Sequence, residues 1–273
     1  MLQVSALYVY PIKSLGGIAV KEALLTERGL QYDRRWMLID SDNRFLSQRE
    51  IARMALFKVA ITGNGLSVTY SPTNSSLQIP FQPLHTQLFE VTVWEDTCLA
   101  QRVSAEADTW FSNILGMPCK LVYMPDDTLR QVDPNYAGEG MVTSFADAFP
   151  LMMISQASLD DLSAKVGAPI PMNRFRPNLV YTGGQPYSED ELASFSINNI
   201  NFYGVKLCAR CPIPGIDQDT AVGGKEPIKT LSSYRRRQNK IYFGQNLIHE
   251  GTGILRVGDA LEILEVKDAV AFD

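Results

Sequence analysis

Closely spaced turn signals between short stretches of strand-forming residues are the feature that most constrains the fold of this chain. Residues 57–61 and 66–70 are rich in apolar, β-branched and aromatic side chains, and they flank Gly63-Asn64-Gly65. Because glycine and asparagine tolerate a positive φ, this pattern predicts a β-hairpin. Residues 91–94 and 98–100 are expected to pair in the same way across Glu95-Asp96. Such repeated hairpins favour a β-rich fold over alternating βαβ units.

Other segments fit a β-rich fold with a few helices. Apolar and polar residues alternate over the start of the chain, from Leu2 to Tyr10, which indicates a strand. Ser104 is a typical N-cap for a helix that ends at Gly116, Ser155 for a second helix, and Pro227 fits the first turn of a third. Further strands are predicted over residues 36–40, 151–154, 178–182, 195–207, 241–248 and 254–264.

Composition narrows the class of protein. The 273 residues, 45% hydrophobic and 20% charged, are typical of a globular protein with one large or two modest domains. The net charge of −5 argues against a general nucleic-acid or membrane-surface binder. The chain shows no signal-peptide pattern and no apolar run of membrane-spanning length. Four cysteines without a disulfide framework favour a reducing compartment, so we expect a cytoplasmic protein.

Residues 124–150 differ from the rest of the chain. They are rich in Pro, Gly, Asp and Asn and show little periodicity. An irregular segment of this length inside a compact chain is usually functional. It is also the expected boundary between two domains, residues 1–123 and residues 124–267, with a site shared between them.

Cys208-Ala209-Arg210-Cys211 is the strongest chemical motif. A thiolate is both a nucleophile and a metal ligand, and the intervening guanidinium favours it. Pro212 and Pro214 make a poor helix start for a thioredoxin-like pair, and a zinc site lacks further ligands at suitable spacing. One or both thiols could therefore serve a cofactor that brings its own remaining ligands, or both could be buried structural cysteines.

Basic residues gather in several short segments. Lys13-Ser14 follows the first strand, and such a strand-end loop can hold an anion. Alternation is expected to send Arg34 and Arg35 to opposite faces of a strand. Arg174 and Arg176 are expected to share a face, with Pro177 enforcing an extended backbone at Arg176, and such a pair suits a phosphate.

A second basic run is formed by Arg235-Arg236-Arg237 with Lys240. A solvated helix end is the favoured interpretation of this run. A docking surface for an acidic redox partner is the alternative.

The segments together resemble the MOSC-domain proteins with an N-terminal MOSC β-barrel region, above all the bacterial relatives of the mitochondrial amidoxime-reducing component. The resemblance implies a β-rich α+β fold with a MOSC β-barrel core, a β-rich N-terminal region and a few peripheral helices. It runs from Tyr10 to Asp259. The matching blocks are residues 10–14, 33–36, 145–150, 173–178, 208–211, 225–227 and 234–235.

The resemblance implies a molybdenum-molybdopterin cofactor (Moco). In such proteins one cysteine thiolate completes the metal's sulfur ligands, and here that catalytic and metal-binding residue is Cys211. The positions that grip the pterin phosphate and ring correspond to Lys13, Ser14, Arg34 and Arg176. The lining positions correspond to Ala148, Phe149, Ala209 and Arg210, where Ala148, Phe149 and Ala209 replace hydroxyl residues and only backbone contacts carry over.

The implied activity is reduction of small N-hydroxylated compounds by oxygen-atom transfer to molybdenum. The chain ends at Asp273 without the four-cysteine ferredoxin-type domain of some bacterial relatives, so we expect a separate electron-donor protein. No nucleic-acid or membrane partner is expected. The alternatives are a non-catalytic cofactor or sulfur carrier, and thiol–disulfide exchange by Cys208 and Cys211.

Overall fold

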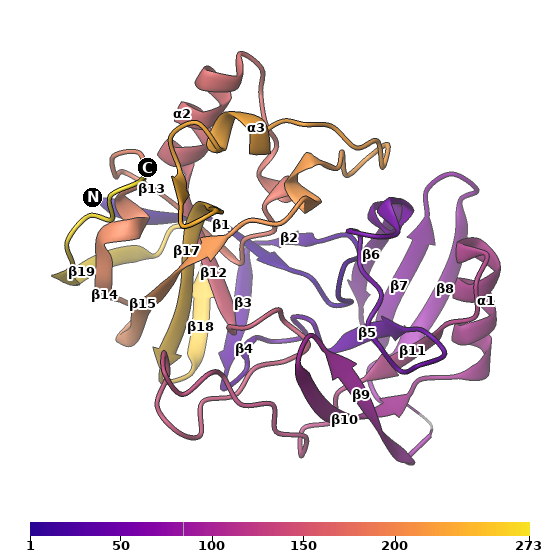
Figure 1. Ribbon diagram of the computed structural model, residues 1–273. Helices are drawn as coiled ribbons and strands as arrows, with labels where there is room; N and C mark the ends of the chain where they lie inside the picture. Colours follow the sequence, from indigo (N-terminus) through magenta and orange to yellow (C-terminus); the bar gives the residue numbers. More distant parts are fainter. Residues whose placement is uncertain (84) are drawn as a thin grey trace.

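A closed barrel of seven strands forms one part of the molecule, which the computed structural model describes over residues 1–83 and 85–273 (Figure 1). The barrel closes because β12 pairs with both β13 and β17. Its strands follow the order β12 (Leu151–Ser155), β13 (Leu179–Thr182), β1 (Leu2–Val9), β19 (Ala260–Val266), β14 (Leu192–Ile197), β15 (Ile200–Ala209) and β17 (Lys240–Glu250). Two short strands extend it, β2 (Ile18–Val20) beside β1 and β16 (Arg236–Arg237) beside β17. The predicted β-rich architecture is confirmed.

Alternating apolar residues fill the barrel. Every second residue of a strand faces the same side of the sheet, so β1 and β17 turn Leu7 and Leu247 inward. Both are fully buried, and the rings of Phe195 and Phe202 stack beside them with their centres 5.2 Å apart.

Three smaller sheets make up the rest of the described β-structure. The first contains β5 (Trp36–Ile39), β11 (Lys120–Tyr123), β10 (Asp96–Arg102) and β9 (Leu88–Val93). The second contains β6 (Phe57–Thr62), β7 (Gly65–Tyr70) and β8 (Ser75–Pro80). The third contains β18 (Gly253–Arg256), β3 (Glu22–Thr26) and β4 (Gly29–Leu30). The first two sheets belong to the N-terminal part, at the right of Figure 1.

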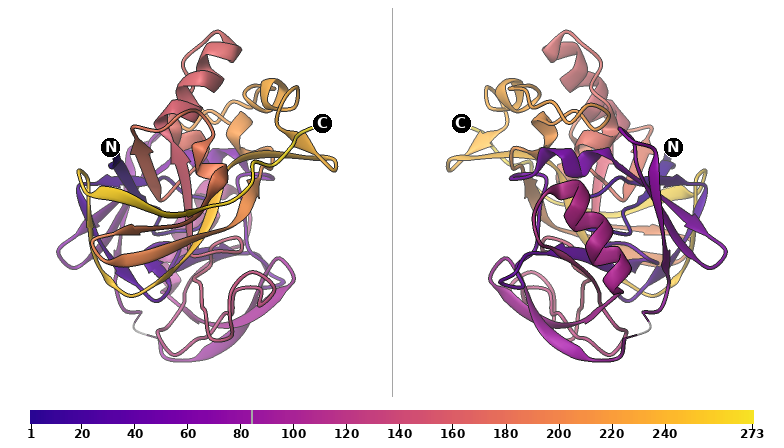
Figure 2. Two further views of the ribbon diagram at one scale, coloured as in Figure 1. Left: turned by 90° about the vertical axis from the view of Figure 1, so that its left-hand side faces the viewer. Right: turned by 90° about the vertical axis from the view of Figure 1, so that its right-hand side faces the viewer.

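Helix α1 (Ala105–Leu115) packs on the N-terminal strands, in front of them in the right-hand view of Figure 2. The Ser104 side chain accepts a hydrogen bond from the Ala107 amide, and Gly116 ends the helix at a φ of 65°, both as predicted. Phe111 carries the apolar face of the helix onto Phe57, with 5.3 Å between the ring centres.

Two helices lie beside the barrel, α2 (Gln156–Val166) and α3 (Ile228–Leu231). Ser155 caps α2 as predicted. Four short 3₁₀ turns are η1 (Ala52–Leu56), η2 (Met172–Arg174), η3 (Ser188–Glu191) and η4 (Ile213–Gly215). Across residues 1–83 and 85–273, no helix has the length and apolar character needed to span a membrane.

Both predicted hairpins are present. Strands β6 and β7 turn between Thr62 and Gly65, and β9 and β10 turn between Val93 and Asp96. Two strand predictions are wrong in extent. Residues 195–207 belong to β14 and β15, because Asn198 and Asn199 adopt positive φ values of 51° and 61°, as a type I′ turn requires.

The second error concerns residues 254–264. They belong to β18 and β19, which lie in different sheets. Gly258, with a φ of 103°, breaks the strand between them.

Arg235 corrects the prediction of a solvated helix end. Its side chain is 5% exposed, donates to the Asp190 carboxylate and lies over the Phe272 ring. Arg235 lies between α3 and β16, and Phe272 of the C-terminal segment covers its side chain. Only Arg236, Arg237 and Lys240 of the run are exposed, in the β16–β17 hairpin.

The stability of the protein is expected to depend on pH because of Glu189, a buried carboxyl group next to Asp190. Burial and the Asp190 carboxylate raise the pKa of Glu189 to about 7, so the fold favours its neutral form. That contribution is complete below the unfolded pKa near 4.5 and is lost as pH rises through 7. We expect Glu189→Gln to gain on the order of 2 kcal/mol relative to the wild type between pH 5 and pH 8. Urea unfolding at both pH values measures this, and an unchanged difference would contradict it.

Candidate functional site

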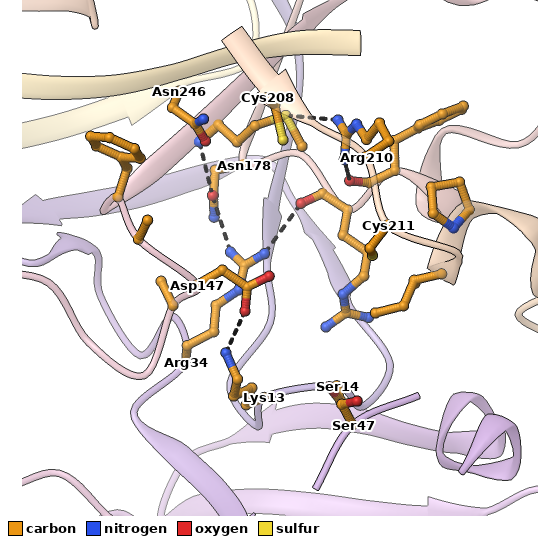
Figure 3. Close-up of a pocket in the computed structure, with 18 of the residues that line it drawn as sticks. Lys13, Ser14, Arg34, Ser47, Asp147, Asn178, Cys208, Arg210, Cys211 and Asn246 are labelled. Atoms are coloured by element: carbon orange, nitrogen blue, oxygen red, sulfur yellow. Dashed lines mark hydrogen bonds and ion pairs between the residues drawn. The ribbon is translucent and has the colours of Figure 1, made fainter. Parts of the chain in front are cut away.

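One cavity lies where the barrel meets the N-terminal part (Figure 3). All of the predicted cofactor residues except Ala209 line it. They arrive on the loop after β1, the turn before β5, the end of the 124–150 segment, the turn after η2 and the end of β15. These segments are distant in the sequence, and the fold alone brings them together.

Lys13 is a buried cation on the floor of this cavity. Its side chain is 5% exposed, and its Nζ donates to the Phe145 carbonyl over 2.8 Å and to the Asp147 carboxylate over 2.6 Å. Burial lowers the pKa of Lys13, although Asp147 opposes the shift. The neighbouring Ser14 also lines the cavity, and Gln48 donates to its carbonyl over 2.7 Å. This loop therefore has fixed positions for both predicted residues.

Arg34 points into the cavity, while Arg35 points away to Tyr123 and the Asp126 carboxylate. Alternation is the wrong reason for this outcome, because β5 begins only at Trp36 and both arginines lie in the preceding turn. Arg34 donates to Asp33 over 2.6 Å and to the Asn178 side chain over 3.0 Å. Its guanidinium is thus held by two buried acceptors.

The extended backbone predicted at Arg176 is also wrong. Arg176 has a φ of 57°, and Arg174 is the last residue of η2, so the two do not share the face of a strand. Both side chains nevertheless line the cavity. Arg174 donates to the Asp217 carboxylate over 3.0 Å, whereas Arg176 donates to the Leu15 carbonyl over 2.7 Å. Burial and the neighbouring Arg34 lower the pKa of Arg176 to about 10.

Three of these residues occupy the left-handed backbone region. The φ values are 65° at Ser14, 48° at Arg34 and 57° at Arg176. This region is unfavourable for residues with a side chain, and such conformations concentrate at binding and catalytic sites. The chain keeps side chains where glycine would fit more easily, which is consistent with a role for them in binding.

A matched pair of substitutions measures this backbone cost. We expect Arg176→Gly to be more stable than Arg176→Ala by about 1 kcal/mol, because glycine adopts a positive φ without strain. Both variants lose the same guanidinium, so the difference isolates the backbone. Guanidinium chloride unfolding provides the measurement. Equal stability of the two variants would show that the backbone at residue 176 is unstrained.

Cys211 follows β15 by two residues and lines the cavity with its neighbour Cys208. Both are free, as are Cys98 and Cys119. Burial raises the pKa of Cys208, although Arg210 opposes the shift. Over residues 1–83 and 85–273, no three His, Cys, Asp or Glu side chains form a cluster that could hold a metal ion. A metal at this site would need most of its ligands from elsewhere.

The remaining predicted residues have different surroundings. Arg210 is fixed by the Phe243 and Phe175 carbonyls, at 2.8 and 2.9 Å. Ala148 is exposed at the cavity, whereas Phe149 is 7% exposed and its ring contacts Tyr136. Ala209 is exposed and does not line the cavity.

The cavity has a strong excess of positive charge. Asp147 is the one carboxylate among its lining residues, against six basic side chains: Lys13, Arg34, Arg49, Arg174, Arg176 and Arg210. Within the described part of the chain, Arg176 and Arg210 have no carboxylate within 4.0 Å. A buried cation without a counter-ion is costly. The arrangement therefore fits an anionic group next to a free thiol, as a phosphate-bearing pterin with a thiolate-liganded metal requires.

Comparison with known proteins identifies the family to which this chain belongs. Residues 1–118 match the MOSC N-terminal beta barrel domain, and residues 141–262 match the MOSC domain. Mitochondrial amidoxime-reducing component 1 of Mus musculus is 30% identical over 279 residues, covering 96% of this chain and 82% of the relative. The chain belongs to the MOSC-domain family.

Two further relatives extend the comparison of this MOSC-domain protein. Mitochondrial amidoxime reducing component 2 of Homo sapiens is 31% identical over 275 residues, covering 94% of this chain and 82% of the relative. Molybdenum cofactor sulfurase of Oryza sativa subsp. japonica is 32% identical over 271 residues. That match covers 91% of this chain but 33% of the sulfurase.

Sequence reasoning missed several residues of the MOSC cavity. Asn178 is 1% exposed and links Arg34 to the barrel, because its side chain accepts from Arg34 and from the Met152 amide and donates to the Tyr8 carbonyl. Asp147 pairs with Lys13. Both lie inside blocks that carry the family resemblance, so their polar side chains within those blocks could have indicated that they line the cavity. Nothing in the sequence marks Asn246, which also lines the cavity.

Proposed function

We propose that this protein is a molybdenum-cofactor-dependent oxidoreductase that reduces small N-hydroxylated compounds. The observation that supports it is the cavity itself, where a free cysteine and cations without carboxylate partners lie together. The names of the amidoxime-reducing relatives, which align over most of their length, point to the same chemistry.

Each group has a distinct proposed task. The Cys211 thiolate would be the protein's ligand to molybdenum, since soft thiolates suit such metals. Lys13, Ser14, Arg34 and Arg176 would hold the pterin phosphate through charge-assisted hydrogen bonds. When bound, the cofactor supplies two-electron transfer and accepts the substrate's oxygen atom. The protein would orient this group, and Ala148 and Phe149, which line the cavity, would border the path of the substrate.

Electrons would come from a separate protein. The sequence contains four cysteines, and they lack the spacing of an iron–sulfur cluster. We propose that such a redox partner docks near the cavity. We also propose the cytoplasm as the compartment, because all four cysteines are free thiols.

A non-catalytic role is the second candidate. The likeness to a molybdenum cofactor sulfurase favours it, because this chain aligns with a third of that protein. In this role the same cavity would carry the cofactor or handle sulfur without turnover. The two roles share the Cys211 ligand and differ in activity.

The deciding experiment combines two measurements on one preparation. The protein is purified without oxygen, its molybdenum and pterin contents are determined, and reduction of a hydroxylamine analogue is assayed with an artificial electron donor. We expect about one molybdenum per chain and turnover. Full molybdenum without turnover would exclude the reductase, and transfer of that cofactor to an apo-enzyme would then establish the carrier.

A further inference from the structure

Tyr10 lies beneath two arginines of the cavity: Arg34, which pairs with Asp33, and Arg176, which has no carboxylate within 4.0 Å among the described residues. The guanidinium carbons of Arg34 and Arg176 both lie over its ring, each 4.3 Å from the ring centre. Tyr10 is 1% exposed and follows β1 directly. An aromatic face attracts a cation, and the attraction grows when water is excluded. The Tyr10 ring therefore attracts both guanidinium groups and offsets part of the repulsion between them.

The backbone of Tyr10 fixes the same arrangement. Its amide donates to Asp33 Oδ1 over 2.8 Å, and Asp33 Oδ2 accepts from Arg34. Its carbonyl accepts from the Arg34 amide over 2.8 Å. Tyr10 thus contacts Arg34 through the backbone, through Asp33 and through its ring.

The hydroxyl group of Tyr10 contributes little to the contact between its ring and the two arginines. Within the described residues the Tyr10 hydroxyl has no hydrogen-bond partner, although it is buried. Burial raises the pKa of Tyr10, so the ring stays neutral at physiological pH. A phenylalanine ring would therefore serve equally well.

Gly17 explains how the ring keeps its place. A Cβ atom at Gly17 would lie 2.2 Å from Tyr10 Cε1 and 2.6 Å from Cδ1, far inside contact distance. Gly17 is not among the residues with a positive φ, so its backbone would accept alanine. The glycine is needed for space, and the space is taken by the Tyr10 ring.

We infer that Tyr10 is a positioning residue, whose ring holds Arg34 and Arg176 as a clamp for a phosphate group. Gly17 leaves the room that this ring needs. The inference rests on the proposed function for the identity of the phosphate-bearing ligand. It assigns to the ring a role in anion binding that is separate from the Cys211 ligand.

The test uses inorganic phosphate as the probe and calorimetric titration of the full-length, cofactor-free protein. We expect Tyr10→Phe to bind phosphate within about threefold of the wild type, and Tyr10→Leu and Gly17→Ala to bind at least about tenfold more weakly. The double variant Tyr10→Leu/Gly17→Ala should be no worse than Tyr10→Leu alone, because leucine vacates the space that the new methyl group needs.

Two controls separate positioning from general damage. Tyr181→Leu removes a fully buried tyrosine that lines no part of the cavity and should lower stability without changing phosphate affinity. Gly63→Ala adds a methyl group with no atom within 4 Å and should change neither. Wild-type affinity in Tyr10→Leu, or a wild type that binds no phosphate, would overturn the inference. If the cofactor-free wild type binds phosphate as expected but the protein purified without oxygen contains no molybdenum, the proposed function alone would be rejected.

Discussion

Cys211→Ser is expected to purify with less than about one tenth of the wild-type molybdenum content, because a serine hydroxyl is a poor replacement for a soft thiolate ligand. Activity should fall with it. Cys208→Ser should keep more than half of the metal. Cys208 packs among apolar residues, and burial raises its pKa, which disfavours the thiolate that a ligand requires.

The asymmetry between these two variants is the decisive outcome. Thiol–disulfide exchange needs both cysteines and predicts equal damage from either substitution. Circular dichroism and thermal unfolding of the two variants provide the folding control. Equal loss of molybdenum in both, with folding intact, would reject Cys211 as the single protein ligand.

Asn178→Leu is expected to lower the free energy of unfolding by about 2–4 kcal/mol, since it removes the hydrogen bonds that a buried side chain makes to three polar groups. The Met152 amide and the Tyr8 carbonyl lose the Asn178 side chain, and the Arg34 guanidinium loses one of its acceptors while keeping Asp33. Guanidinium chloride unfolding measures the loss. Phosphate affinity should fall as well, because Arg34 loses an acceptor that fixes it.

Asn113→Leu is the matched control, because Asn113 is exposed on α1. It should change stability by less than about 0.5 kcal/mol. Asn178→Asp should have an intermediate effect, since a carboxylate still accepts from Arg34 but cannot donate to the Tyr8 carbonyl. If Asn178→Leu were as stable as the wild type, the hydrogen bonds of the Asn178 side chain would make no net contribution to the free energy of unfolding.

The elements that were predictable are those with local causes. Gly63-Asn64-Gly65 marks the β6–β7 turn, although none of the three residues has a positive φ and Gly65 packs closely against Ile79. Ser104 and Gly116 set the two ends of α1. Asn198-Asn199 is also a local turn signal, but it lies within an apolar run that by itself favours one continuous strand. The division of the chain at residues 123 and 124 stays a prediction, although β1 lies in the barrel rather than with the N-terminal sheets.

The site was predictable as a set of residues and not as a geometry. The sequence blocks identified Lys13, Arg34 and Arg176, all of which line one cavity. Their backbone conformations could not be predicted, because a positive φ at an arginine depends on tertiary contacts that outweigh its local preference. The roles of Tyr10 and Gly17 are of the same kind, since they exist only through contacts between distant segments.

The position of β1 in the barrel determines when the site can form during synthesis. This strand pairs with β13 and β19, so its neighbours include Thr182, Leu261 and Ala260. The residues that follow it, including Lys13, leave the ribosome first, whereas the Lys13 partners Phe145 and Asp147 emerge much later, and β19 closes the barrel beside β1 only near the end. The nascent chain must therefore stay without its completed anion pocket through nearly the whole of translation. Under the proposed function, the cofactor would therefore bind after the segments that line the cavity have been synthesised.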